Sequence, residues 1–226
     1  NSLFEDPAEI AFGMRLAVEK FNDIAMQQAN KLMEDESCSG EIKTALGEIL
    51  NANQVTGDDI NEQIRRIDDI KSELAKIPDP LGKELLSVIE YLAKKSVWAF
   101  GGDGWAYDIG YGGVDHVLAS NKNVNILVMD TEVYSNTGGQ SSKATPIGAV
   151  AKFAAGGKPT YKKDMGLIAM SYGYIYVGRV AMGANPNQVV KAFIEAEAYD
   201  GPSLLLCYSH CIAHGIDMTN GYNEQK

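Results

Sequence analysis

The order of apolar and polar residues divides the chain into two parts. Up to residue 95, apolar residues recur at helical spacing. This pattern predicts a helix from Pro7 to a stop at Gly40, a short helix over 41–51, and two more that begin after Thr56 and at Asp79-Pro80. The first part of the chain is therefore expected to be helical throughout.

From residue 97 onward, short apolar runs alternate with helix-like stretches. The runs are VWAFGG, NVNILVMD, YIYVGRV and PSLLLCY, and the helix-like stretches cover 105–120, 146–155, 164–172 and 186–199. This alternation predicts an α/β fold, a parallel sheet with helices on both faces. Ligands of such sheets bind beyond the carboxyl ends of the strands, so the segments to inspect are 101–104, 130–136 and 208–215.

Charge and glycine content change at the same place. Residues 1–95 carry 19 acidic and 11 basic residues, whereas residues 96–226 carry 11 and 9. Only 5 of the 23 glycines precede residue 96. We therefore predict a helical, acidic section over 1–95, a helical-hairpin insertion packed on the core, and an α/β core over 96–226. The first residue is asparagine rather than methionine, which suggests a fragment.

Composition excludes several classes of protein. An acidic surface without a basic stripe argues against nucleic-acid binding. No run of about 18 apolar residues is present, which argues against a membrane-spanning helix. Three cysteines do not form a disulfide framework, and they favour a reducing compartment, the cytoplasm.

The candidate chemistry lies in the glycine-rich stretch GGDGWAYDIGYGG, which begins at Gly101. Neither the dinucleotide fingerprint nor the P-loop spacing fits this chain. Asp103 follows one predicted strand and Thr131 follows the next, so the two are expected side by side. A carboxylate beside bare backbone suits a divalent cation held against a diphosphate. The simpler alternative is that Asp103 only caps the next helix and that SNTGGQ is a polar turn.

A longer match identifies the family. The GDG motif, followed after about 25–30 residues by a hydroxyl side chain, resembles the diphosphate half-site of thiamin diphosphate enzymes. The string from Gly102 to Lys158, with NSLFED and YSHCIAHG, resembles the thiamin diphosphate-binding domain of the pyruvate:ferredoxin (flavodoxin) oxidoreductases. The resemblance covers nearly the whole chain and implies the thiamin diphosphate-binding fold.

The resemblance assigns roles to individual residues. Magnesium would be bound by Asp103, Thr131 and the carbonyl of Val133. Asn136 would lie by the diphosphate or the thiazolium ring, and the backbone at Gly102 and Gly104 would approach the phosphates. No catalytic residue is expected in this chain, because the activating glutamate belongs to a different domain.

Cys211 matches one ligand of a [4Fe–4S] cluster in the resembled family. A cubane cluster takes four cysteines, and this chain has only Cys38 and Cys207 besides Cys211. Cys207 sits in an apolar run and is expected in the core. The cluster is therefore expected only in the full-length enzyme.

The implied parent enzyme of anaerobic metabolism oxidatively decarboxylates pyruvate to acetyl-CoA and CO2. It passes electrons through [4Fe–4S] clusters to ferredoxin or flavodoxin. Its partners would be the remaining domains, coenzyme A and a second copy in a homodimer, and the fragment alone would be inactive. Two alternatives stay open: another thiamin diphosphate-dependent 2-oxo acid oxidoreductase or decarboxylase, and a non-catalytic interaction module.

Overall fold

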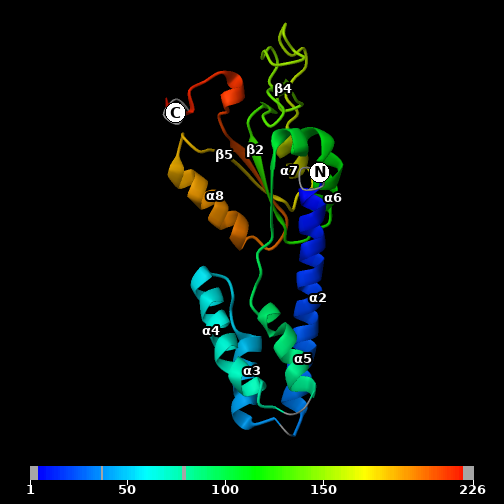
Figure 1. The fold of residues 1–226 in the computed structure, drawn as a ribbon, viewed down its shortest axis with the longest axis vertical. Helices are drawn as coiled ribbons and strands as arrows, with labels where there is room; N and C mark the ends of the chain where they lie inside the picture. Colours follow the sequence, from blue (N-terminus) through cyan, green and yellow to red (C-terminus); the bar gives the residue numbers. More distant parts are fainter. Residues whose placement is uncertain (1–4, 37, 78–79, 221–226) are drawn as a thin grey trace. The chain divides into compact units, whose positions relative to one another are not determined.

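The computed structural model describes residues 5–36, 38–77 and 80–220 (Figure 1). The first four residues of NSLFED, and Asp79 at the predicted start of the fourth helix, lie outside these ranges. The chain divides into a helical unit, residues 16–96, and an α/β unit, residues 1–15 with 97–226. The predicted boundary after residue 95 lies beside the junction at 96/97. The first residues group with the α/β unit because Ala8 and Ala11 are buried in its core.

Four of the helices follow the apolar spacing of the first part of the chain. They are α2 (Pro7–Glu34), α3 (Gly40–Asn51), α4 (Gly57–Leu74) and α5 (Pro80–Val88), and a 3₁₀ turn, η1 (Ile89–Leu92), follows. Thr56 caps α4 through a reciprocal pair of hydrogen bonds with Asp59, as the Thr-x-x-acid spacing favours. The predicted helical section is confirmed.

The helical unit has its own apolar core. Leucine and isoleucine side chains from each of its helices are buried together, among them Leu32, Leu46, Ile67, Leu74 and Leu85. The buried amide of Gln63 donates to the carbonyls of Ile49 and Leu92, at 2.9 and 3.3 Å, and so satisfies backbone groups at two helix ends. This unit is therefore held together mainly by a continuous apolar stripe on each helix.

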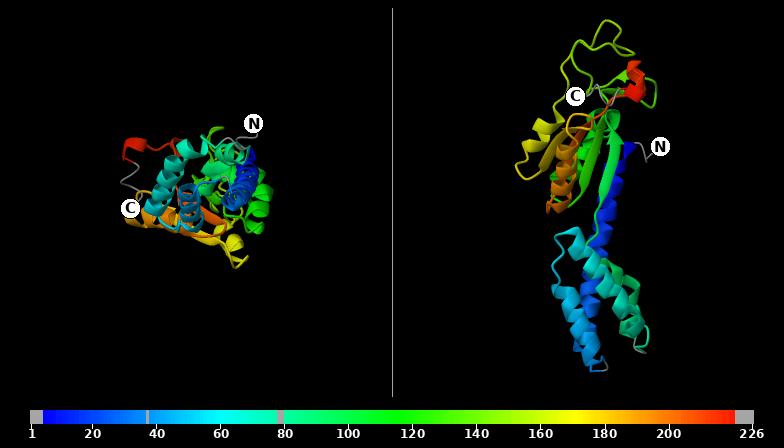
Figure 2. Two further views of the ribbon diagram at one scale, coloured as in Figure 1. Left: turned by 90° about the horizontal axis from the view of Figure 1, so that it is seen from below. Right: turned by 90° about the vertical axis from the view of Figure 1, so that its left-hand side faces the viewer.

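The α/β unit is built on a four-stranded parallel sheet (Figure 2). Its strands are β1 (Trp98–Gly102), β2 (Asn125–Asp130), β5 (Tyr176–Ala181) and β6 (Ser203–Tyr208), in the order β1-β2-β6-β5. All neighbouring pairs are parallel. The carboxyl ends of β1 and β2 are adjacent, because Gly102 is in register with Met129.

Helices cover both faces of this sheet, as predicted. They are α6 (Tyr111–Ala119), α7 (Met165–Met170) and α8 (Pro186–Ala198). Along β6, Leu204 and Leu206 pack with residues of α6 and α7, whereas Leu205 packs with Ala192 and Ala196 of α8. This alternation is the period of two that a strand buried on both faces requires.

The predicted helix over 146–155 is wrong. That segment forms turns and two isolated bridges, Gln140 with Lys152 and Ala151 with Ala154. It follows a short antiparallel pair, β3 (Val133–Tyr134) and β4 (Gln140–Ser141). Its alanine-rich composition favours a helix, but Pro146 precedes Gly148, and both Gly148 and Phe153 have left-handed φ angles of 79° and 64°.

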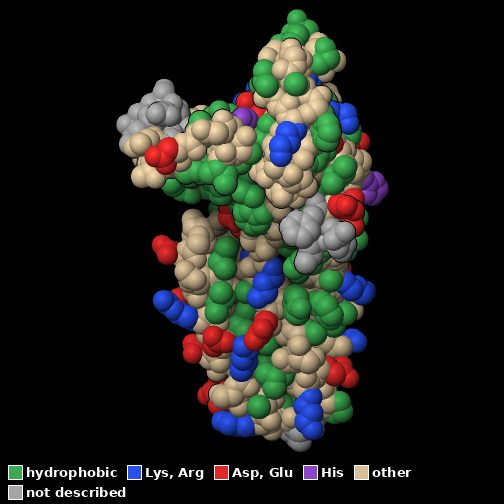
Figure 3. All heavy atoms as spheres, turned by 45° about the horizontal axis from the view of Figure 1, so that its top comes forward, with side chains coloured by type: hydrophobic (Ala, Val, Ile, Leu, Met, Phe, Trp, Pro, Cys, Tyr) green, Lys and Arg blue, Asp and Glu red, His purple; other side chains and the backbone are tan. Residues whose placement is uncertain are grey.

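The same segment brings apolar side chains to the surface (Figure 3). Phe153 is 93% exposed, and Val150 and Tyr161 are also largely exposed. Between Val133 and Lys163 the sequence contains five lysines and no acidic residue, against a net charge of −10 for the whole chain.

Within the described residues, no helix has both the length and the hydropathy needed to cross a bilayer.

Candidate functional site: an oxygen cluster at the ends of β1 and β2

The glycine cluster serves two different purposes. After β1 the chain enters a single π-helical turn, η2 (Gly104–Ile109), with Asp103 directly before it. Such π-helical turns are rare and often lie at functional sites. A Cβ atom at Gly101 would lie 2.1 Å from the Trp105 ring, and one at Gly104 would lie 2.3 Å from the Tyr134 ring. These two glycines are therefore required for packing around the turn.

Gly102 differs from its neighbours. A Cβ atom built on Gly102 would meet no atom within 4 Å, so the space beside this backbone is open. Gly102 ends β1, at the edge of the sheet where ligands of parallel sheets bind. The residue directly before Asp103 therefore offers bare backbone to an open space.

Three oxygen atoms surround the hydroxyl of Thr131, which follows β2. Its Oγ1 lies 3.0 Å from Asp103 Oδ1, 3.1 Å from the Val133 carbonyl oxygen and 2.7 Å from Ser135 Oγ. A threonine hydroxyl has one proton to donate, whereas a carboxylate and a carbonyl can only accept. The single Thr131 proton can serve only one of its two acceptors, Asp103 Oδ1 or the Val133 carbonyl, so the cluster holds a surplus of oxygen lone pairs that a cation would satisfy.

Asp103 is buried in this cluster. Its side chain is 1% exposed, and Oδ2 accepts a hydrogen bond of 2.9 Å from Ser142 Oγ. Burial raises the pKa of the Asp103 carboxyl from 3.8 to about 6, although the hydrogen bonds from Ser142 and Thr131 oppose this shift. Asp103 is thus a carboxylate whose charge has hydroxyl partners but no cationic partner in this cluster.

The spacing of these oxygens fits a small divalent cation. In octahedral coordination at 2.0–2.1 Å, neighbouring ligand oxygens are about 2.9 Å apart. The distances from Thr131 Oγ1 to Asp103 Oδ1 and to the Val133 carbonyl are 3.0 and 3.1 Å. Within the described ranges, no three His, Cys, Asp or Glu side chains gather as a metal cluster. Ligands for a hard cation would thus be one carboxylate, one hydroxyl and one carbonyl.

The two acidic residues that flank Thr131 share one lysine. Lys162 Nζ lies 2.6 Å from Asp130 Oδ2 and 2.9 Å from Glu132 Oε1. Burial lowers the pKa of Lys162, but the hydrogen bonds and charges of Asp130 and Glu132 outweigh this effect and raise it above its ordinary value. Lys162 is therefore held as an ammonium ion directly behind the oxygen cluster.

The remaining predicted residues lie at different distances from the cluster. Asn136 is exposed in the turn between β3 and β4. Cys211 is buried just after β6, where its Sγ accepts a hydrogen bond from the Ala213 amide at 3.4 Å. Three residues on, His214 Nε2 lies 2.7 Å from the carbonyl oxygen of Thr131. The segment after β6 thus reaches the same rim of the sheet.

The cysteines of this chain do not by themselves fit an iron–sulfur cluster. Cys38 belongs to the helical unit, and Cys207 lies in β6. Cys207 is only partly buried and packs against the core rather than within it, and burial raises the pKa of its thiol to about 11. A four-cysteine cluster therefore needs ligands beyond this chain.

Four contributors to the site escaped sequence analysis: Ser135, Ser142, Lys162 and His214. Ser135 and Ser142 lie in the polar stretch SNTGGQSS, whose serines carry no motif that distinguishes them from the residues of a polar turn. The antiparallel pairing of β3 with β4 returns the chain toward Asp103 and so places Ser142 there. A run of lysines without acids between residues 133 and 163 was the available signal for Lys162.

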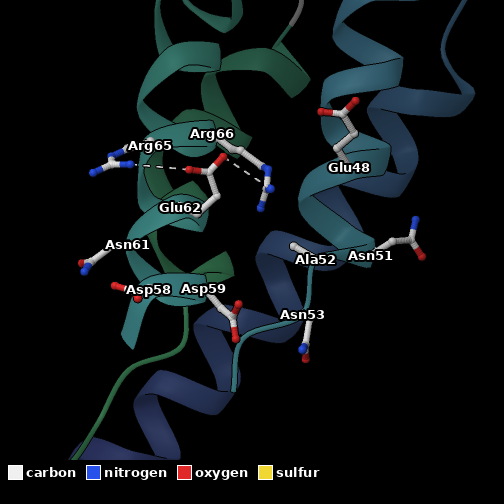
Figure 4. Close-up of a pocket in the computed structure, with 10 residues that line it drawn as sticks. All are labelled: Glu48, Asn51, Ala52, Asn53, Asp58, Asp59, Asn61, Glu62, Arg65 and Arg66. Carbon is white, nitrogen blue, oxygen red and sulfur yellow. Dashed lines mark ion pairs between the residues drawn. The ribbon is translucent and has the colours of Figure 1, made fainter. Parts of the chain in front are cut away.

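A polar hollow of about 910 Å³ lies in the helical unit, between the end of α3 and the start of α4 (Figure 4). Its two arginines are paired with one carboxylate, because Glu62 lies 3.6 Å from Arg65 and 3.4 Å from Arg66. Glu48 and Asp58 add further negative charge to the same wall. Asp59, also on its wall, is used in the cap of α4. The hollow is thus a polar surface depression that none of the sequence-predicted site residues lines, and it is not the candidate site.

Comparison with known proteins locates the chain in one family. The family profile described as "Thiamine pyrophosphate enzyme, C-terminal TPP binding domain" matches residues 80–207, more than half of the chain. This range includes Asp103, Thr131 and Val133. The parallel sheet and its covering helices agree with this assignment.

Longer relatives match the chain from end to end. A pyruvate-flavodoxin oxidoreductase of Nostoc is 60% identical, and a putative one of Synechocystis is 59% identical. A pyruvate:ferredoxin oxidoreductase of Moorella thermoacetica is 56% identical. Each match covers 100% of this chain but only 18–20% of the relative.

One solved structure, a 2-oxoglutarate:ferredoxin oxidoreductase from Magnetococcus marinus, is 23% identical with a TM-score of 0.48. That likeness covers 66% of this chain and 46% of the other, and it is too low to support an argument. The family profile and the end-to-end relatives are sufficient: the chain belongs to the thiamine pyrophosphate enzymes, whose C-terminal cofactor-binding domain it carries.

Proposed function

We propose that this chain is the diphosphate- and magnesium-binding half-site of a pyruvate:ferredoxin (flavodoxin) oxidoreductase. The whole enzyme would decarboxylate pyruvate oxidatively, form acetyl-CoA and CO2, and pass the electrons to ferredoxin or flavodoxin. The observation that carries the proposal is the surplus of oxygen lone pairs around Thr131. The relatives of 56–60% identity support the choice of pyruvate.

The metal ligands in this proposal are Asp103, Thr131 and the carbonyl of Val133. Burial has already removed the Asp103 carboxylate from water, so little hydration is lost when it meets a cation. Ser142 fixes its second oxygen and thereby the orientation of the carboxylate. The chain thus presents a preformed set of oxygens for magnesium.

The cofactor would extend from this metal toward the open space at Gly102. Backbone at Gly102 and Gly104 would approach the diphosphate, and Asn136 would lie by the diphosphate or the thiazolium ring. When bound, thiamin diphosphate supplies the electron sink for decarboxylation of a 2-oxo acid. The residues of this chain bind and orient it, and we assign none of them a role in proton transfer.

Cys211 is proposed as one ligand of a [4Fe–4S] cluster whose other ligands lie outside this chain. The support is its buried position after β6, on the rim that His214 connects to Thr131. Because the chain spans only 18–20% of its relatives, the sites for pyruvate, coenzyme A and the electron carrier are expected in other domains. Activity would require those domains, in a cytoplasmic homodimer.

The test is a calorimetric titration of the full-length enzyme with thiamin diphosphate, with and without magnesium. We expect binding that depends on magnesium and falls at least about 100-fold in Asp103→Ala, since removing a metal-bound charge costs several kcal/mol. Glu62→Ala, a carboxylate of the polar hollow, is the matched control and should bind as the wild type does. Binding without magnesium, or full binding by Asp103→Ala, would contradict the proposal.

A further inference from the structure

The segment that carries two of the three proposed metal ligands has an unusual backbone. Between Thr131 and Val133, Glu132 has a left-handed φ angle of 65°. Such a conformation costs a non-glycine residue about 1–3 kcal/mol and persists only where the surroundings enforce it. It also turns the Val133 carbonyl back toward Thr131 Oγ1, 3.1 Å away. The geometry of the oxygen cluster therefore depends on whatever holds this turn.

Two side chains contact the backbone of the turn, His214 at the Thr131 carbonyl and Thr145 at the Glu132 carbonyl, and Lys162 contacts its side chains from both sides. Its ammonium contacts Asp130, directly before Thr131, and Glu132, directly after it, at 2.6 and 2.9 Å. One Asp130 oxygen, Oδ2, also accepts from Tyr107 at 2.9 Å, whereas Oδ1 is buried without a partner in the described structure. The Asp130 carboxylate therefore relies on Lys162 for its charge balance, and Glu132 is bound to the same cation.

Three other lysines of this segment have different partners. Lys143 Nζ lies 3.2 Å from Asp108, Lys158 Nζ donates to the Thr145 carbonyl, and Lys163 Nζ donates to the Tyr107 carbonyl. None of these contacts involves residues 130–133. Lys162 is thus distinguished from its neighbours by its two partners.

We propose that Lys162 is a positioning residue for the metal half-site: by bridging Asp130 and Glu132 it fixes the turn that aims the Thr131 hydroxyl and the Val133 carbonyl at one cation. This inference rests on the proposed function and adds to it a determinant of metal affinity that touches neither metal nor cofactor. Residues that orient metal ligands from behind typically change affinity about 10–100-fold when they are removed.

The experiment compares Lys162→Met, Lys162→Arg and Lys143→Met in the full-length enzyme. Binding of thiamin diphosphate is measured while magnesium is varied, and thermal unfolding is followed in parallel. For Lys162→Met we expect the half-saturating magnesium concentration to rise about 10–100-fold, while cofactor binding at saturating magnesium is retained. Lys162→Arg keeps the cation and should come within about threefold of the wild type. Lys143→Met removes an exposed lysine from a partly buried carboxylate that lies outside residues 130–133, and its magnesium requirement should not differ.

A wild-type magnesium requirement in folded Lys162→Met would overturn the inference. If removal of the ammonium prevents folding, because it leaves Asp130 buried and unpaired, the decisive variant is Glu132→Gln, which weakens only one side of the bridge. Its half-saturating magnesium concentration should rise about threefold, and an unchanged value would overturn the inference. A wild-type enzyme that binds the cofactor without magnesium would instead refute the proposed function, so the two failures are distinguishable.

Discussion

The polar hollow of the helical unit and the oxygen cluster of the α/β unit use similar residues in opposite ways. In the hollow, the Glu62 side chain is half exposed and lies within ion-pair distance of Arg65 and Arg66. In the cluster, Asp103 is 1% exposed and is met by hydroxyl groups. The hollow has volume and an excess of acidic side chains, and both of its arginines are already paired with Glu62. The cluster gathers hydroxyl and carbonyl oxygens around a buried carboxylate that contacts no cationic side chain in the described structure.

The two arrangements also differ in what they contribute to stability. Exposed ion pairs of the kind seen in the hollow are worth about 0–1 kcal/mol each. A buried carboxylate without a cation costs free energy, and the raised pKa of Asp103 reflects that cost. A group that opposes folding and is nevertheless held by specific hydrogen bonds indicates function. The comparison therefore favours the small cluster over the large hollow as the binding site.

The largest contrast is expected between two threonine-to-valine changes. Thr131→Val removes the hydroxyl at the centre of the cluster and should raise the half-saturating magnesium concentration about 10–100-fold, because one ligand is lost. Thr44→Val removes a hydroxyl from α3 that only donates to the Gly40 carbonyl within its own helix. It should leave magnesium dependence unchanged. Titration of cofactor binding against magnesium checks both variants. An equal magnesium requirement in the two variants would contradict the assignment of Thr131 as a metal ligand.

Two glycine-to-alanine changes separate packing from binding within the same turn. Gly104→Ala should lower the free energy of unfolding by roughly 1–3 kcal/mol, because its Cβ would lie 2.3 Å from the Tyr134 ring. Gly102→Ala meets no atom within 4 Å and should unfold within about 0.5 kcal/mol of the wild type. It should nevertheless weaken cofactor binding, since the methyl group would occupy the open space. Chemical denaturation measures the effect on unfolding, and calorimetry measures the effect on binding. Normal cofactor binding by Gly102→Ala would show that the diphosphate does not occupy the open space beside Gly102.

The smallest effect concerns pH in metal-free protein. The folded-state pKa of Asp103, about 6, lies above its ordinary value of 3.8. The protonated carboxyl therefore favours the folded state at low pH, and this contribution to the free energy of unfolding is lost as pH rises through 6. The shift corresponds to about 3 kcal/mol. Asn exchanges one acceptor oxygen for a donor and so loses part of this gain, so with a chelator at pH 7.5 Asp103→Asn should be more stable than the wild type by about 1 kcal/mol. Asp59 in the cap of α4 has a lowered pKa, chiefly through its hydrogen bond with the Thr56 backbone. The free energy that the Asp59 carboxylate contributes to folding is therefore present above its ordinary pKa and is lost on acidification.

Asp59→Asn should thus destabilise the protein at neutral pH, with the opposite sign to Asp103→Asn. Unfolding free energies of both variants between pH 4 and pH 8 check the pair. The account of the cluster would be contradicted if Asp103→Asn were clearly less stable than the wild type without metal, because Asp103 would then be a structural residue.

Sequence patterns predicted the parts of this molecule that depend on local periodicity. The cap at Thr56 and the four apolar runs that became β1, β2, β5 and β6 follow from helical and strand spacing. The pairing of Asp103 with Thr131 was also predicted, because the carboxyl ends of neighbouring parallel strands must meet. The features that escaped prediction depend on tertiary contacts instead.

The segment from 146 to 155 shows where local reasoning fails. Its alanines favour a helix, yet the amide and carbonyl groups there bond to other strands and turns, as in the hydrogen bond of 2.8 Å from the Gly148 amide to the Lys158 carbonyl. Ser142 and Lys162 likewise reach Asp103 and Asp130 only through tertiary contacts, Ser142 after the pairing of β3 with β4 and Lys162 after the turns of this segment. Residue type alone does not encode such a return path.

The most direct test of the central claim is a crystal structure of the full-length enzyme with thiamin diphosphate and manganese in place of magnesium. Anomalous scattering locates manganese independently of the protein atoms. The account predicts a single peak at the ends of β1 and β2, within about 2.0–2.3 Å of Asp103 Oδ1, Thr131 Oγ1 and the Val133 carbonyl oxygen. A cofactor-bound structure with manganese elsewhere, or with Asp103 still bonded only to hydroxyl groups, would contradict it.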